Sequence, residues 1–144
     1  EHVINPKKVV KEISRVIKTN GIIYSETPFI QSVHEGPFDF SRFTLSGHRY
    51  LFKDFEMIKI GGNKGPELVL VWAFRYFIWS LTRSKKVARL LGLSFGLMMR
   101  PFSVLMSSES MYDASSGVFF LGQKAREKLS VSHKDIISLY RGQY

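Results

Sequence analysis

The N-terminal stretch, residues 1–25, constrains the fold most, because a helix pattern and a strand pattern meet there across a tight turn. Asn5-Pro6 is typical of a helix start, with Asn as the N-cap and Pro at the first helical position. Asn20-Gly21 predicts the helix end, since Gly accepts the left-handed backbone that ends many helices. Residues 22–24 predict a short buried strand, and the combination predicts an α/β fold. The helix carries apolar residues at helical spacing: Val9, Val10, Ile13, Val16 and Ile17.

Composition narrows the class of partner. The chain has 144 residues, which indicates one domain, and its formal net charge is +9. Such a charge favours an anionic membrane surface, an anionic substrate or nucleic acid as a partner. The absence of cysteine excludes disulfides and thiolate metal sites. The four histidines are dispersed without metal-ligand spacing, so we expect no metal.

Further elements follow along the chain. Thr44 is positioned to cap a helix that reaches about Lys53. Residues 55–60 alternate between apolar and polar, and residues 117–122 are apolar and bounded by glycines, so both predict strands. Residues 61–66 predict a turn, and they lack the Gly-Lys-Ser/Thr of a phosphate loop. Residues 107–116 predict a polar loop.

An apolar insertion spans residues 68–106. Its two apolar runs do not reach the roughly 20 unbroken apolar residues of a membrane span, because Gly92, Gly96 and Pro101 interrupt the second run. No acid occurs between Trp72 and Phe102, and two apolar runs with a basic connector are one pattern of an interfacial hairpin on an anionic membrane surface. A buried helical insertion, or a lid over the site, is the alternative. A nucleic-acid partner is disfavoured, because the basic residues interleave with apolar ones. The connector between the runs is basic: Arg83, Lys85, Lys86 and Arg89.

The loop of residues 27–44 is the predicted site, since polar residues in a loop after a buried strand often carry function. His34 is a candidate general base, because an imidazole exchanges protons near neutral pH; a hydrogen bond within the loop is the alternative. Asp39 and Arg42 lie three residues apart, which favours a structural ion pair over contact with a substrate. The aromatic residues nearby favour core positions over a substrate platform: Tyr24, Phe29, Phe38 and Phe40.

The order of these pieces resembles the C-terminal half of a class I S-adenosylmethionine-dependent methyltransferase of the small-molecule type. Glu1-His2-Val3 with Asn5-Pro6 is similar to the family's "LEHV-x-(D/N)-P" segment. Residues 12–21 resemble its "E-x-x-R-V-L-K-P-G-G" helix and turn, with Thr19 and Asn20 in place of Pro and Gly. Residues 28–44 resemble "PF…H…P-x-D-F-x-R-(F/Y)-T", a loop of the branch found among cell-surface polysaccharide genes, and residues 116–124 resemble its closing strand.

The resemblance implies a Rossmann-like sheet. Its fifth strand would be residues 21–25, its sixth residues 55–60 and its seventh residues 117–121, with the seventh antiparallel and beside the fifth. Residues 1–124 would be the C-terminal part of the domain, including the helical insertion at 68–106. Residues 125–144 would form a polar tail.

The resemblance also implies a methyl transfer from S-adenosylmethionine to a small-molecule or glycan acceptor. His34 would be catalytic, while Asp39, Arg42 and Phe29 would contact the acceptor. Glu1 and His2 would lie beside the cofactor. The Gly-rich turn that holds the cofactor in this family is absent, so this chain alone is not expected to bind it or to be active. A cytoplasmic location is implied. The alternative is a non-catalytic, membrane-peripheral binding or scaffolding module with the same fold.

Overall fold

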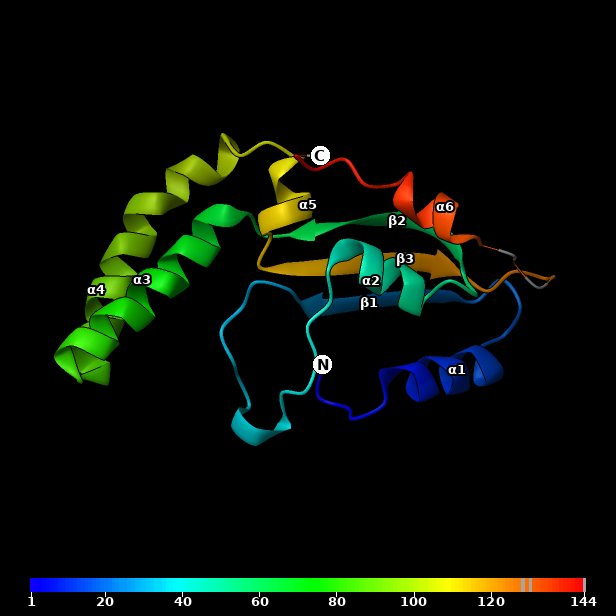
Figure 1. The fold of residues 1–144 in the computed structure, drawn as a ribbon, viewed down its shortest axis with the longest axis horizontal. Helices are drawn as coiled ribbons and strands as arrows, with labels where there is room; N and C mark the ends of the chain where they lie inside the picture. Colours follow the sequence, from blue (N-terminus) through cyan, green and yellow to red (C-terminus); the bar gives the residue numbers. More distant parts are fainter. Residues whose placement is uncertain (128, 130, 144) are drawn as a thin grey trace.

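The computed structural model is an α/β fold built around a three-stranded sheet (Figure 1), which confirms the predicted class. It describes residues 1–127, 129 and 131–143; the other three residues of the predicted polar tail lie outside the description. The elements, in chain order, are α1 (Pro6–Val16), β1 (Ile22–Pro28), η1 (Gly36–Phe38), α2 (Leu45–Leu51), β2 (Glu56–Asn63), α3 (Pro66–Thr82), α4 (Lys85–Met99), η2 (Arg100–Val104), α5 (Ser110–Ala114), β3 (Gly117–Gln123) and α6 (His133–Ile137).

The sheet has the order β1-β3-β2, and β3 runs antiparallel to both of its neighbours. β1 and β2 are therefore parallel to each other, and their carboxyl ends meet at one edge of the sheet. All three predicted strands are present, but β2 runs through Gly61 and Gly62, where the sequence predicted a turn. Glycine is needed there because α5 packs closely: a Cβ on Gly62 would lie 2.8 Å from the carbonyl oxygen of Met111.

The helix boundaries follow local capping. Asn5 Oδ1 accepts a hydrogen bond from the Lys8 N–H at 3.0 Å, which confirms the predicted N-cap of α1. α1 ends at Val16, and the left-handed residue after it is Asn20, with φ of 64°, rather than Gly21 as predicted. Gly21 is constrained for another reason, since a Cβ there would lie 2.6 Å from the Ile17 side chain.

The hydrophobic core lies on one face of the sheet. Because side chains alternate along a strand, Ile23 and Phe120 point to this face, where helix α1 also contributes a buried side chain. Phe52 stacks on Phe120 with ring centroids 5.0 Å apart, and Phe55 is fully buried beside it. Side chains of this size each contribute about 2–3 kcal/mol when buried. The core cluster comprises Val10, Ile23, Phe52, Phe55 and Phe120.

The opposite face of the sheet is largely open. Ile22 and Tyr24 are 56% and 60% exposed, although the sequence favoured a core position for Tyr24. Phe38 and Phe40, in and beside η1, are also exposed, so the same expectation is wrong for them. Phe29 is half-buried.

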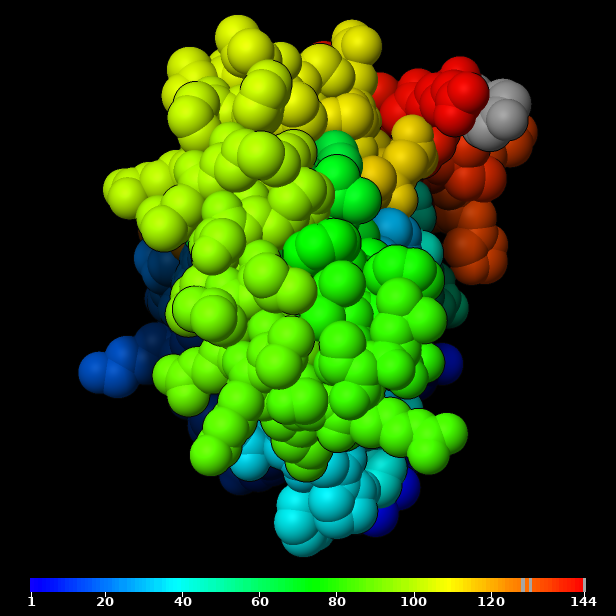
Figure 2. All heavy atoms as spheres, turned by 90° about the vertical axis from the view of Figure 1, so that its left-hand side faces the viewer, coloured from blue at the N-terminus to red at the C-terminus, as the bar shows by residue number. Residues whose placement is uncertain are grey.

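Helices α3 and α4 form a hairpin that projects beyond the end of the sheet (Figure 1) and covers the face seen in Figure 2. α3 is described in full and contains no buried residue; in α4 only Ala88 and Gly92 are buried. Gly92 faces α3, since a Cβ there would lie 3.1 Å from the Arg75 Cβ. The two helices thus pack on each other rather than in the core.

α4 changes to the 3-10 helix η2 at Arg100, beside Pro101, but the two are continuous, whereas the sequence predicted that Gly92, Gly96 and Pro101 leave this run too short to span a membrane. Among the described residues this segment, Lys85–Val104, is the one helix long and apolar enough to cross a membrane: it has 20 residues, and an 18-residue window of it has a mean hydropathy of 1.2, with 11% of that window buried. Length and composition alone are weak evidence, because a core helix of a soluble protein passes the same test.

Two short helices lie in regions that the sequence predicted as a polar loop and a polar tail. α5 occupies part of the predicted loop at residues 107–116 and packs on β2. α6 begins with a capping box in which Ser132 and Asp135 bond each other's backbone N–H groups. Its Ile136 is buried.

Candidate functional site

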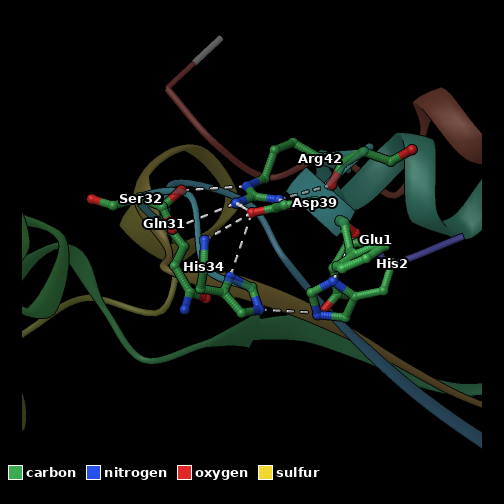
Figure 3. Close-up of polar contacts among 9 residues, drawn as sticks. Glu1, His2, Gln31, Ser32, His34, Asp39 and Arg42 are labelled. Carbon is green, nitrogen blue, oxygen red and sulfur yellow. Dashed lines mark hydrogen bonds and ion pairs between the residues drawn. The ribbon is translucent and has the colours of Figure 1, made fainter. Parts of the chain in front are cut away.

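The loop after β1 and the first two residues of the chain form one polar cluster (Figure 3). The Phe40 N–H donates to the Glu1 carbonyl oxygen at 3.0 Å, and His2 Nδ1 lies 3.0 Å from the Phe38 carbonyl oxygen. These contacts hold the N-terminal segment against the loop. Residues that are more than 30 positions apart in the sequence therefore share a site at the carboxyl end of β1.

Asp39 and Arg42 form the ion pair that their spacing predicted. Both Asp39 oxygens accept hydrogen bonds from the Arg42 guanidinium, and the Asp39 side chain is only 1% exposed. This pairing holds the pKa of Asp39 well below its ordinary value and raises the pKa of Arg42. Arg42 also donates to the carbonyl oxygens of Gln31 and Ser41, so the pair fixes the loop's shape. Contact of Asp39 and Arg42 with an acceptor stays a prediction.

His34 lies between two carboxylates. Its Nδ1 is 3.6 Å from Asp39 Oδ2, and its Nε2 is 3.6 Å from Glu1 Oε1. The backbone N–H of His34 donates to Asp39 Oδ2 at 3.0 Å, whereas the buried ring nitrogen Nδ1 lies beyond hydrogen-bond distance of the same oxygen. The side chain is 34% exposed. An imidazole with each nitrogen facing a carboxylate can accept a proton at Nε2.

Glu1 also approaches His2, which packs edge-to-face on His34. Glu1 Oε1 is 3.3 Å from His2 Nε2, and the centroids of the two imidazole rings are 4.9 Å apart. Glu1, His2 and His34 offer three metal-ligand atoms that all lie within 4.8 Å of one another. Residue spacing did not indicate this group, because two of its members are adjacent and the third lies in a distant loop.

Two hollows adjoin the cluster. One, of about 200 Å³, lies at the carboxyl ends of β1 and β2 and is lined by Glu1, Glu26, Thr27, Pro28, Gln31, Asn63, Ser116 and Gly117. The other, of about 180 Å³, lies between the loop and the base of the hairpin, and its lining includes His34, Trp72, Arg75 and Tyr76. The α3–α4 hairpin therefore borders the site. Phe29, predicted to contact the acceptor, has its N–H bonded to the Ser116 carbonyl oxygen at 2.9 Å.

Polar residues at the strand ends belong to this site, although the sequence did not single them out. The Asn63 amide donates to Glu26 Oε1, and the Tyr24 hydroxyl donates to Glu26 Oε2 at 2.7 Å. Ser116 Oγ donates to the Asn63 carbonyl oxygen at 2.9 Å. The sequence feature that could have indicated these residues is their position in or next to the predicted strands. Side chains of neighbouring strands come close together at the strand ends.

The described residues do not form a complete site for S-adenosylmethionine. Neither hollow reaches the roughly 300 Å³ at which ligand pockets begin. The carboxylate of Glu1, a predicted cofactor contact, already faces two imidazoles. The sequence also has no Gly-rich turn of the kind that binds a nucleotide cofactor at a helix N-terminus.

No family model, no curated protein and no solved structure matches the chain. A relationship to methyltransferases therefore stays a prediction.

Proposed function

We propose that residues 1–124 are the C-terminal part of an S-adenosylmethionine-dependent methyltransferase domain that acts on a small-molecule or glycan acceptor. One observation carries the proposal: the polar cluster around His34 lies at the carboxyl end of β1, beside the carboxyl end of the parallel strand β2. Ligands of open α/β sheets bind at this edge.

The sheet supports the proposal in two ways. β3 lies antiparallel beside β1, which is the placement that the resemblance implies for strands seven and five of a Rossmann-like sheet. In addition, Ile22, Tyr24 and Ile58 are exposed, whereas sheets of this kind are covered on both faces. Further protein packed on this face would bury these side chains.

On this proposal the chain provides the acceptor side of the reaction. Nε2 of His34 takes the proton from an acceptor hydroxyl, while Asp39 faces Nδ1 and fixes the orientation of the ring. Arg42 holds Asp39 in place. S-adenosylmethionine supplies the methyl group, and residues beyond this chain hold most of it, with Glu1 and His2 at the margin of its site.

Replacement of His34 tests this assignment in the intact protein that contains the chain. We expect His34→Ala to lower turnover by about a hundredfold or more, the usual contribution of a general base, at an unchanged melting temperature. His133→Ala, in the first turn of α6, is the matched control and should retain the wild-type rate. Equal rates for wild type and His34→Ala would remove the base from the proposal.

A second candidate function is membrane-peripheral binding through the α3–α4 hairpin. The observation that favours it is the combination of exposed apolar side chains with basic residues and no acid between Trp72 and Phe102. Lys85 Nζ lies 4.9 Å from the Trp79 ring centroid near the hairpin tip. Aromatic and basic residues together are typical of protein surfaces at a membrane interface. The exposed apolar residues include Leu81, Leu90, Leu93, Leu97 and Met98.

Co-sedimentation with anionic vesicles tests the hairpin. Each basic residue near an anionic surface contributes about 1 kcal/mol, so four of them change binding by several orders of magnitude at low salt. Charge reversal of the connector should release the protein, whereas the same reversal on α1 and at Lys18, just after it, should not. The connector set is Arg83, Lys85, Lys86 and Arg89, and the control set is Lys7, Lys8, Lys11 and Lys18. Equal release by both sets, or no co-sedimentation of the wild type, would contradict a membrane-binding hairpin.

A further inference from the structure

We propose that Glu1, His2 and His34 bind a divalent first-row transition-metal ion. Two imidazole nitrogens and one carboxylate oxygen, from two segments distant in the sequence, lie within 4.8 Å of one another. Imidazole and carboxylate are ligands of zinc, iron, cobalt and nickel, whereas magnesium and calcium prefer oxygen ligands alone. The proposal concerns binding of the ion and does not depend on methyl transfer.

The spacing of the three ligand atoms is close to that of a bound site. Metal bonds of about 2.0–2.2 Å at tetrahedral or octahedral angles place neighbouring ligand atoms about 3.0–3.5 Å apart. Glu1 Oε1 is 3.3 Å from His2 Nε2 and 3.6 Å from His34 Nε2. The two imidazole nitrogens lie within 4.8 Å of each other, so side-chain rotations that move the ligand atoms by up to about 1 Å would complete the geometry.

The surroundings of both imidazoles favour a ligand role for Nε2. Ligand histidines in metal sites usually donate their other N–H to a carbonyl or a carboxylate, which leaves the coordinating nitrogen unprotonated. Here His2 Nδ1 is 3.0 Å from the Phe38 carbonyl oxygen, and His34 Nδ1 faces Asp39 Oδ2 at 3.6 Å. Arg42 holds Asp39 in turn. Both Nε2 atoms face the same oxygen of Glu1 (Figure 3).

Three protein ligands leave at least one coordination position for water or an oxygen of a bound molecule. The open position would adjoin the hollow at the carboxyl ends of β1 and β2, because Glu1 lines that hollow. A cation on His34 Nε2 occupies the lone pair that a general base needs. With a cation bound, His34 would be a ligand and not the base of the proposed function, and the cation would lower the pKa of an oxygen bound to it.

A cobalt titration tests the site directly. The 144-residue chain, first treated with a chelator, should develop visible cobalt absorption that saturates near one equivalent, and zinc should displace it. Glu1→Gln and His34→Gln should each weaken cobalt binding by at least about tenfold, because loss of a second-shell partner already costs that much. His133→Gln and Glu12→Gln replace the same residue types on α6 and α1 and should bind like the wild type.

His34→Gln also excludes a simpler explanation. An α-amino group beside His2 could bind cobalt without the loop, and such binding would survive His34→Gln. Unchanged affinity in that variant, equal weakening in the two control variants, or no saturable absorption in the wild type would each overturn the proposal. Melting temperatures of all variants check that a loss of binding is not a loss of fold.

Discussion

His48 is expected to make the stability of the folded chain fall as the pH decreases. Its side chain is fully buried, its ring packs edge-on against Phe52 with centroids 5.1 Å apart, and its Nε2 lies 3.1 Å from Ser25 Oγ. Burial lowers the pKa of His48 from 6.5 to about 4. The folded protein therefore keeps this imidazole neutral at pH values where the unfolded chain protonates it.

The sign and size of the effect follow from this difference. Below the ordinary pKa the unfolded state binds a proton that the folded state does not, so folding stability decreases as the pH falls. The stability that depends on a neutral His48 is fully present above pH 6.5 and is lost by about pH 4. The whole difference corresponds to on the order of 3 kcal/mol, of which about 2 kcal/mol falls between pH 7 and pH 5. Small domains have only about 5–15 kcal/mol of stability.

Urea unfolding at about pH 7, 6 and 5 measures this change. His48→Gln replaces the imidazole with a side chain that does not titrate, so its stability should depend much less on pH over this range. His133→Gln should keep the wild-type dependence of stability on pH, because His133 is exposed on α6. A wild-type stability that is constant between pH 7 and 5, or an equal slope in His48→Gln, would refute the reasoning.

Two further predictions concern packing. Phe120→Ala should cost about 3–5 kcal/mol in urea unfolding, because the ring is fully buried against Phe52, whereas Phe38→Ala, at a 64% exposed position, should stay within about 0.5 kcal/mol. Gly62→Ala should lower the melting temperature, because its Cβ would clash with the backbone of α5. Gly96→Ala should raise it through about 0.5–1 kcal/mol of helix propensity, because the nearest atom, Val71 Cγ1, is 3.4 Å away. A melting temperature that is higher for Gly62→Ala than for Gly96→Ala would contradict the packing described.

Local signals in the sequence predicted most of the elements. Asn5 and Thr44 cap helices as expected, because a cap depends on hydrogen bonds within four residues. The strands were also predicted, but the extension of β2 through Gly61 and Gly62 was not. That extension depends on pairing with β3, about 56 residues away in the sequence. Glycines in a sequence indicate a flexible backbone, but they do not indicate whether a distant strand pairs with that backbone.

The candidate site was predictable in part. The Asp39–Arg42 pair is local in sequence, and the spacing indicated it. The meeting of Glu1 and His2 with His34 depends on backbone hydrogen bonds between the N-terminal segment and the loop, which no spacing reveals. Tyr24 was misjudged for a related reason: its aromatic character is clear, but which face of the sheet is covered is decided elsewhere in the fold.

The measurement that tests the central claim most directly is a calorimetric titration with S-adenosylmethionine. One sample is the 144-residue chain, and the other is the chain extended by the residues encoded upstream of Glu1. We predict saturable binding to the extended protein and none to the short chain, because the short chain has no Gly-rich turn and only small hollows beside the cluster. No saturable binding to the extended protein would contradict the methyltransferase proposal, and tight binding to the short chain would contradict the placement of the cofactor outside it.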